Sequence, residues 1–194
     1  MTEADVRTQI LRCATRLFAE RADGSTSVRD IVEAAGVTKP TMYYWFKSKE
    51  ALFVAIVRHH LEALRALVEQ AVATPGSVRE RLQRFVEAYV RGAMEDRDAV
   101  RLLLSLRQPH GGSCEHPDLD MMTLHLQHIR PLVHLIEEAQ ASGELRNDLV
   151  PLEAVLALIG MVNLQVLAAM HGLEPTSESL SRLLDLFYFG AASR

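Results

Sequence analysis

The sequence has few of the residues on which several large classes of protein depend. Its 194 residues include only two cysteines, Cys13 and Cys114, so it lacks the framework of a small disulfide-bonded domain. No apolar run approaches the roughly 20 residues that a membrane-spanning helix needs, and Asn163 and Gln165 interrupt the nearest one, residues 154–170. The first ten residues are polar and acidic, unlike a secretory leader. We therefore expect a cytoplasmic protein with no membrane partner.

The sequence also lacks the motifs by which enzymes are commonly recognised. It has no nucleophile elbow, phosphate-binding loop, dinucleotide fingerprint or zinc-protease motif. We therefore expect no enzymatic activity and no cofactor. No strand pattern is present either, because apolar residues recur at spacings of three and four, as they do on the buried face of a helix. These spacings predict an all-α fold.

Capping residues, glycines and prolines divide the chain into nine expected helices. They cover about residues 6–18, 28–34, 39–46, 49–73, 78–94, 96–107, 119–141, 151–171 and 177–192. Ser27, Thr38 and Ser48 are expected to cap helix starts by accepting a hydrogen bond from an exposed amide. Gly36 is expected to end the second helix, because glycine accepts the left-handed conformation found there. Pro131 is expected to kink or split the seventh.

The charge distribution sets the first 60 residues apart from the rest. The whole chain has a net charge of −4, yet residues 1–60 carry nine Lys/Arg against seven Asp/Glu. All three lysines of the chain, Lys39, Lys47 and Lys49, lie within eleven residues of one another. Such a cluster on an acidic protein is typical of a small DNA-contacting face, although a merely solvated patch has the same composition.

Residues 27–46 have the pattern of two helices joined by a tight turn. The sequence reads SVRDIVEAAGV and then TKPTMYYWF. The apolar positions that would set the crossing angle are Val28, Ile31, Ala35, Val37, Met42 and Phe46. This pattern predicts a helix-turn-helix, whose second helix lies in the major groove of DNA. Hydroxyls on Thr38, Thr41, Tyr43 and Tyr44 suit phosphates, and Lys39 can reach a base edge or a phosphate.

The run TSVRDIVEAAGVTKPTMYYWFKSKEALF resembles the DNA-binding signature of the TetR family of bacterial regulators. The resemblance covers about residues 8–57; beyond them the chain is similar to the family only in its helical layout and in the phrase GELRNDL. It implies a helix-turn-helix domain over residues 1–47. It further implies a helical regulatory and dimerisation domain over residues 48–194, with helix 49–73 as connector. The implied function is a sequence-specific transcriptional regulator, in the family's usual form a ligand-responsive repressor that binds a palindromic operator as a homodimer.

The resemblance also implies roles for individual residues in the DNA-binding part. The expected contacts to DNA are Thr26, Ser27 and Arg29 with phosphates, Lys39, Pro40, Thr41 and Tyr43 with bases, and Thr38, Tyr44 and Lys49 with the backbone. Trp45 stands where the family often has histidine, and we therefore expect it to pack at the edge of the domain rather than to contact DNA.

The last two helices are apolar on more than one face, as expected of helices buried on two sides. The resemblance implies that they form a four-helix bundle with a second copy of the chain. The residues expected at this dimer interface are Val155, Ile159, Val162, Val166, Leu183 and Phe187.

A small-molecule site is expected between the fifth, sixth, seventh and eighth helices. The candidates are polar or soft residues on otherwise apolar helices: Met94, Met121, Met122, His125, His128 and Asn163. Asn163 could equally bond across the dimer interface. We expect few basic residues to line the site itself, which favours an apolar or weakly polar effector. We expect such a ligand to push on helix 49–73 and change the spacing of the two recognition helices.

Two alternatives remain open from the sequence. His110, Cys114 and His116 share one loop and could make the chain a metal- or redox-responsive regulator. Their spacing is not that of a structural zinc site, however, so we expect no metal. The second alternative is a helical interaction module that binds no DNA.

Overall fold

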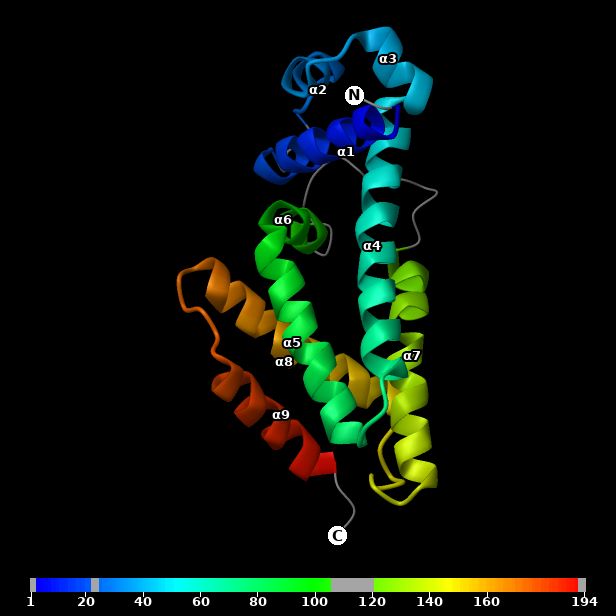
Figure 1. Ribbon diagram of the computed structural model, residues 1–194, viewed down its shortest axis with the longest axis vertical. Helices are drawn as coiled ribbons and strands as arrows, with labels where there is room; N and C mark the ends of the chain where they lie inside the picture. Colours follow the sequence, from blue (N-terminus) through cyan, green and yellow to red (C-terminus); the bar gives the residue numbers. More distant parts are fainter. Residues whose placement is uncertain (1–2, 22–24, 106–120, 192–194) are drawn as a thin grey trace. The chain divides into compact units, whose positions relative to one another are not determined.

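The computed structural model describes residues 3–21, 25–105 and 121–191, and these residues form nine α-helices and no strand (Figure 1). The helices are α1 (Glu3–Glu20), α2 (Val28–Ala35), α3 (Lys39–Trp45), α4 (Lys49–Ala73), α5 (Val78–Glu95), α6 (Arg97–Ser105), α7 (Met121–Ala141), α8 (Pro151–Met170) and α9 (Ser177–Ala191). The predicted all-α fold is confirmed, and no predicted helix end differs from the observed one by more than three residues.

The chain forms two compact units. The first comprises Met1–Leu61 with Asp96–Met121, and the second comprises Glu62–Glu95 with Met122–Arg194. Helix α4 therefore contributes to both units. The first unit is larger than the predicted domain of residues 1–47, because α6 packs against α1. Where the functional boundary falls along α4 stays a prediction.

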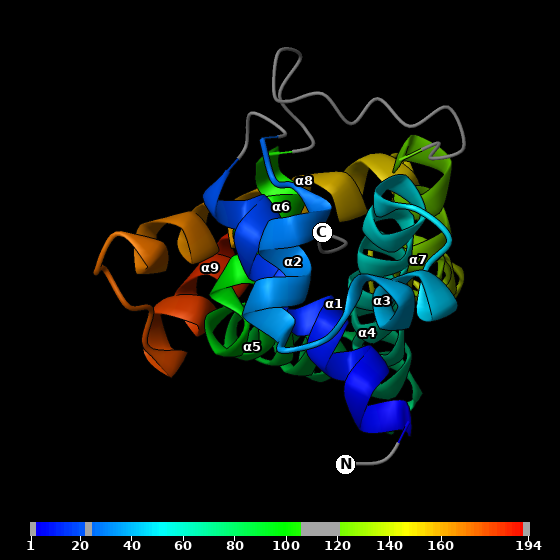
Figure 2. The same cartoon turned by 90° about the horizontal axis from the view of Figure 1, so that it is seen from above.

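The first unit is built around α1, which packs against both α2 and α6, while α2 packs against α3 (Figure 2). Ile10 and Ala14 of α1 and Leu52 and Ile56 of α4 are completely buried. Full burial of a side chain the size of leucine or isoleucine contributes roughly 1.5–3 kcal/mol to folding. This core fixes the platform on which the two short helices α2 and α3 stand.

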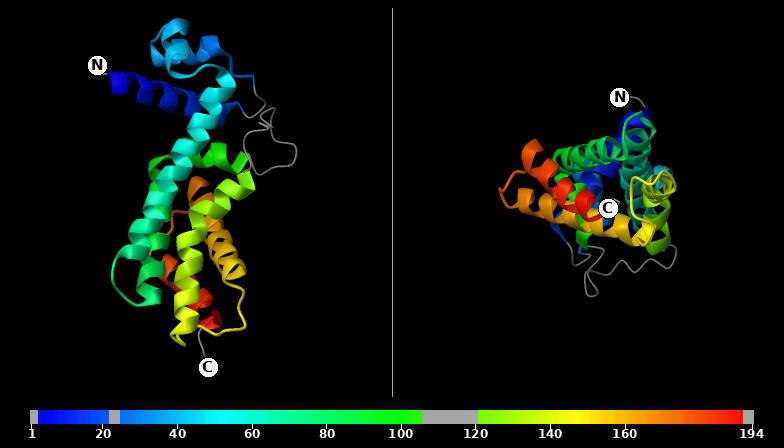
Figure 3. Two further views of the ribbon diagram at one scale, coloured as in Figure 1. Left: turned by 90° about the vertical axis from the view of Figure 1, so that its right-hand side faces the viewer. Right: turned by 90° about the horizontal axis from the view of Figure 1, so that it is seen from below.

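In the second unit, α9 and α8 pack against α5 and against each other (Figure 3). Phe85, Val155 and Leu184 form part of their shared core. Polar bonds tie the same helices together: Nε of Arg79 on α5 donates to the Asp185 carboxylate of α9 at 3.0 Å. The unit is thus held by an apolar core with ion pairs at its edges.

The sequence predicts that Pro131 kinks or splits the seventh helix. Helix α7 continues through Pro131, so it is not split. A proline inside a helix removes one hydrogen bond and costs about 3 kcal/mol. Leu132, Leu135 and Ile136, which follow it, are completely buried, and this packing outweighs the local cost.

Helix α8 is the one helix in the described part of the chain that is long and apolar enough to cross a membrane, judged by length and composition alone. One such helix is weak evidence, since the core helix of a soluble protein has the same composition. Seven of its residues are buried against the rest of the second unit. We interpret α8 as a core helix.

Candidate nucleic-acid interface

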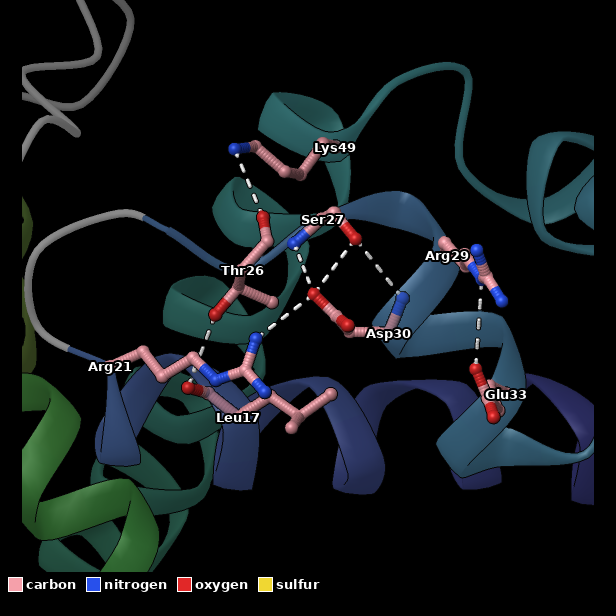
Figure 4. A network of polar contacts seen from close by, with 8 residues as sticks. All are labelled: Leu17, Arg21, Thr26, Ser27, Arg29, Asp30, Glu33 and Lys49. Atoms are coloured by element: carbon pink, nitrogen blue, oxygen red, sulfur yellow. Dashed lines mark hydrogen bonds and ion pairs between the residues drawn. The ribbon is translucent and has the colours of Figure 1, made fainter.

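Helix α2 begins with a reciprocal capping box (Figure 4). The backbone N–H of Asp30 donates to Ser27 Oγ at 3.2 Å, and the backbone N–H of Ser27 donates to Asp30 Oδ2 at 2.9 Å. Arg21 pairs with the same carboxylate oxygen at 2.9 Å. The hydrogen bond from the Ser27 backbone, then that from its hydroxyl, and to a smaller extent Arg21, hold the pKa of Asp30 below its ordinary value. The start of α2 is therefore rigid and remains at the surface.

The turn between α2 and α3 depends on Gly36. Its φ of 62° is in the left-handed region, which a residue with a Cβ occupies at a cost. Two backbone bonds close the turn: the N–H of Gly36 donates to Glu33 O, and the N–H of Val37 donates to Val32 O at 3.0 Å. This pair of bonds is the Schellman arrangement, which satisfies the last carbonyls of α2 and directs the chain into α3.

Helix α3 buries one side and presents the other to solvent. Met42 is 0% exposed and Phe46 is 5% exposed, as the sequence predicts for the inward positions. Tyr43 is 45% exposed and Tyr44 is 72% exposed, although large aromatic side chains usually avoid water. Lys39 and Pro40 are exposed as well, and Thr41 is half-buried beside them. The outward face thus carries a cation, hydroxyls and two aromatic rings.

Thr38 caps α3 and is linked to Thr41. Its Oγ1 accepts a hydrogen bond from the backbone N–H of Thr41 at 3.3 Å and lies 2.8 Å from Thr41 Oγ1. Trp45 is half-buried and packs edge-on against Tyr44, with ring centroids 5.1 Å apart. The position of Trp45 agrees with the expectation that it packs rather than reaches outward.

The structure contradicts the expected contact between the Thr26 side chain and a phosphate. Its side chain is 1% exposed and its hydroxyl donates to Leu17 O at 3.2 Å, so in this arrangement the side chain cannot reach a phosphate. Lys49 is half-buried, and its Nζ donates to the backbone carbonyl of Thr26 at 3.2 Å (Figure 4). Val28 and Val37, expected in the core of the motif, are half-buried at its edge.

Arg29 lies at the exposed start of α2. Its Nε is 3.9 Å from a carboxylate oxygen of Glu33, and both side chains are more than three-quarters exposed. Such a pair is worth little in water, so Arg29 can turn to a phosphate at small cost. The contacts expected for Arg29, for Ser27 and for the outward residues of α3 stay predictions.

Two further residues of α1 support the motif and were not expected from the sequence. Gln9 donates from Nε2 to Ala35 O at 2.8 Å, which ties α1 to the end of α2. The guanidinium of Arg7 lies 5.5 Å from the centre of the Phe46 ring, at the end of α3. Helical periodicity placed Ile10 and Ala14 inward, but polar residues on the flank of that face gave no signal.

Comparison with known proteins agrees with this geometry. Residues 10–56 match the model of a family described as bacterial regulatory proteins, tetR family. Residues 10–56 thus carry the DNA-binding signature of that family, which supports a TetR-family transcriptional regulator. The transcriptional activator FasR of Mycolicibacterium smegmatis is 34% identical over 97 residues, which are 50% of this chain and 44% of FasR. The chain therefore matches less than half of FasR.

Two other known proteins match more of this chain. The transcriptional repressor KstR2 of Mycolicibacterium smegmatis is 29% identical over 147 residues, 75% of this chain and 70% of KstR2. The crystal structure of FadR from Bacillus subtilis in complex with stearoyl-CoA superposes with a TM-score of 0.75 at 21% identity, covering 94% of this chain and 98% of that one. The family members are DNA-binding transcription regulators rather than enzymes, and they bind ligands in some cases.

Most of the residues expected at a dimer interface pack within one copy of the chain, and their place in a dimer stays a prediction. Five of the six are already buried inside one copy: Val155, Ile159, Val162, Val166 and Leu183. Phe187 is half-buried. Side chains buried to this extent within one copy offer little surface to a partner. The large apolar residues that do reach the surface of α8 and α9 are Leu152, Leu156, Leu164, Leu167, Leu186 and Phe189.

The residues expected at the effector site are only partly described. Asn163 accepts a hydrogen bond from the hydroxyl of Tyr89 at 2.7 Å, and Tyr89 was not selected from the sequence. His128 is 4% exposed and Met94 is half-buried. The side chains of the other three candidates lie outside the described residues: Met121, Met122 and His125.

The His/Cys loop cannot be placed in the same way. His110, Cys114 and His116 lie outside the described residues. Within residues 3–21, 25–105 and 121–191, no group of three or more His, Cys, Asp or Glu side chains could hold a metal ion.

Proposed function

We propose that this TetR-family regulator is a ligand-responsive repressor that acts in the cytoplasm as a homodimer on a palindromic operator. The observation that carries the proposal is the exposure of Tyr43 and Tyr44 on a short helix whose opposite side, Met42 and Phe46, is buried. Exposed aromatic residues beside a lysine suit contacts with DNA better than contacts with water.

The positions of the outward residues support a division of labour on DNA. Lys39, Pro40, Thr41 and Tyr43 would face base edges, where lysine bonds to guanine and threonine contacts the thymine methyl group. The hydroxyl of Tyr44 and the residues at the start of α2 would contact phosphates and fix the register. Lys49 would contribute charge from the start of α4.

A second copy of this chain is the proposed occupant of the apolar face on α8 and α9. Six large apolar side chains are exposed there, among them Leu164 at 64%, Leu186 at 75% and Phe189 at 72%. Gly160 and Gly190 are exposed on the same two helices, and a Cβ added to either would meet nothing within 4 Å. Such a surface suits a self-complementary dimer contact. A dimer would present two recognition helices about 34–36 Å apart, or a multiple, as successive major grooves require.

The proposed effector is an apolar or weakly polar small molecule. The side chains of α5 and α8 that meet at Tyr89 and Asn163 offer one neutral polar pair in an otherwise apolar setting. FadR, a similar fold, was crystallised with stearoyl-CoA. A long-chain acyl-CoA is therefore the first probe we would use, with free coenzyme A as the control that lacks the apolar chain.

Selection of bound sequences from a random DNA pool tests the DNA-binding part. We expect a palindrome whose half-sites are about 10 base pairs apart, centre to centre, or a multiple, and an affinity that falls steeply with salt. Lys39→Ala should change the selected sequence. Tyr44→Phe should weaken binding but leave the selected sequence the same. Failure to enrich any sequence would favour an interaction module instead.

The sign of regulation and the effector need separate experiments. A reporter gene behind the selected operator should fall in expression when the protein is present, whereas a rise would make the protein an activator. Stearoyl-CoA at micromolar concentration should release the purified protein from that operator, and free coenzyme A should not. If stearoyl-CoA and a panel of uncharged apolar compounds all leave the affinity unchanged, the effector proposal fails while the DNA-binding proposal stands.

A further inference from the structure

Three polar side chains of the first unit meet where α1, α4 and the start of α6 come together. Thr15 on α1 is 4% exposed, and the His60 side chain on α4 is 13% exposed. Nε2 of His60 lies 3.2 Å from Thr15 Oγ1, and Nδ1 lies 3.7 Å from Oδ2 of Asp96, the residue that precedes α6. One imidazole therefore stands between α1 and the start of α6.

Each end of this link also has a structural role. The other oxygen of Asp96, Oδ1, accepts a hydrogen bond from the backbone N–H of Ala99 at 2.9 Å and so caps the first turn of α6. Thr15 lies on the helix that carries Gln9, and the amide of Gln9 bonds to the end of α2. A displacement of the Asp96 cap is thereby connected, through His60, to the helix that supports the DNA-reading motif.

The positions of the hydrogens follow from the donors and acceptors. The hydroxyl of Thr15 donates its single hydrogen to Leu11 O at 2.9 Å, because a carbonyl oxygen only accepts. Nε2 of His60 must then carry a hydrogen and donate to Thr15. In the neutral ring, Nδ1 is left with a lone pair that faces the Asp96 carboxylate and makes no bond. Only the protonated ring can donate to Thr15 and Asp96 at once.

The surroundings make that protonation unfavourable in the observed arrangement. Burial lowers the pKa of His60 below its ordinary value of 6.5. The Asp96 charge from the start of α6 opposes this shift, and His59, its neighbour on α4, reinforces it. The contact from α1 is the uncharged Thr15. A proton can be accommodated only if Asp96 closes the 3.7 Å gap or if the ring moves towards water.

We propose that His60 is a positioning residue whose protonation moves either the Asp96 cap or the imidazole ring out of the observed arrangement. This movement loosens the hold of α6 and α4 on α1, so that acid weakens operator binding without any small-molecule ligand. The proposal rests on the DNA-binding function. Loosening α1 costs affinity because the motif formed by α2 and α3 is then less preorganised on its platform.

The first test compares operator affinity at about pH 7.5 and pH 5.5 for three proteins. The wild type should lose about fivefold more affinity than His60→Gln on acidification. Glutamine can still donate to Thr15 but does not titrate. His171→Gln is the control, because this histidine is exposed and lies in the second unit, and it should follow the wild type. Equal losses in the wild type and His60→Gln would overturn the proposal.

The second test needs no DNA and stays informative if a variant folds poorly. Nitrogen-15 NMR of the histidine rings should show the neutral His60 ring with its hydrogen on Nε2. The pKa of His60 should lie below the ordinary value and fall further in Asp96→Asn. A ring that titrates at the ordinary value, or an Asp96→Asn variant without effect, would overturn the link. If the wild type binds no operator sequence at any pH tested, the result would instead count against the DNA-binding function.

Discussion

The hydroxyl of Ser27 satisfies an amide at the start of α2 that would otherwise face water. Ser27→Ala should lower the free energy of unfolding by about 1 kcal/mol, as loss of an N-cap commonly does. It should also weaken operator binding, because the capped turn presents Arg29. Urea unfolding and fluorescence anisotropy with labelled operator would measure the two effects.

The second unit supplies a matched control for Ser27→Ala. Ser77 forms the same reciprocal box with Glu80 at the start of α5, where the backbone N–H of Ser77 donates to Glu80 Oε2 at 2.8 Å. Ser77→Ala should lose a similar stability of about 1 kcal/mol but keep full operator affinity. Equal affinity losses in the two variants would mean that only general stability matters.

Because of Tyr188, the stability of the second unit is expected to fall at alkaline pH. Its hydroxyl donates to Glu144 at 2.6 Å, and burial, together with this bond and the Glu144 charge, raises the pKa of Tyr188 to about 12. A raised tyrosine pKa means that the folded state holds its proton more tightly than the unfolded state. The stabilisation is therefore complete below the ordinary pKa of 10.0 and is lost as pH rises from there to about 12.

The variant Tyr188→Phe tests this dependence. It should be less stable than the wild type by about 1 kcal/mol at neutral pH, a value at the low end for a charged partner because Tyr188 is half-buried. The difference should shrink above pH 10. Chemical unfolding at several pH values would show this, and a difference that stays constant through the alkaline range would contradict it.

At the scale of elements, Gly36 sets the angle between α2 and α3. A Cβ added there would meet nothing within 4 Å, so the cost of Gly36→Ala comes from the φ of 62° and not from a clash. We expect a loss of about 1 kcal/mol in stability and a clear loss of operator affinity. Gly36→Asn should recover part of both, because asparagine tolerates this conformation better.

Gly143 provides the control for the Gly36→Ala substitution. It has a φ of 79° with nothing within 4 Å of an added Cβ, and it follows α7 in the second unit. Gly143→Ala should cost a similar stability without affecting an operator bound by α3. If Gly36→Ala leaves operator affinity unchanged, the turn does not determine how α3 is presented.

The ends of the helices could be predicted because the forces that set them are local. Ser27, Thr38 and Gly36 act on amides and carbonyls a few residues away, so their roles are visible in the sequence. The roles of Thr26 and Gln9 could not be predicted, because their partners are Leu17 and Ala35, carbonyls on other parts of the fold.

At the scale of the whole molecule, the sequence could not show which side of α8 packs within its own chain. The helix is apolar around most of its surface, so periodicity does not separate Val162, which is completely buried, from Leu164, which is 64% exposed. Because α5 and α9 pack against α8, most of the expected interface residues are buried within one copy, and we propose the exposed apolar residues of α8 and α9 instead.

A substitution on the exposed side of α8 tests whether two copies of the chain bind a palindromic operator together. Leu164→Glu places a charge in the proposed contact between two copies, where it would be buried without a partner. The variant should be monomeric by light scattering and should bind a palindromic operator at least about tenfold more weakly, because two linked half-sites no longer act together. Ala66→Glu adds the same charge at an exposed position of α4 and should stay dimeric with full affinity. If the Leu164→Glu variant is still a dimer, the two copies meet at another surface. If the wild type binds a palindrome as independent monomers, the apolar face of α8 and α9 has some other partner.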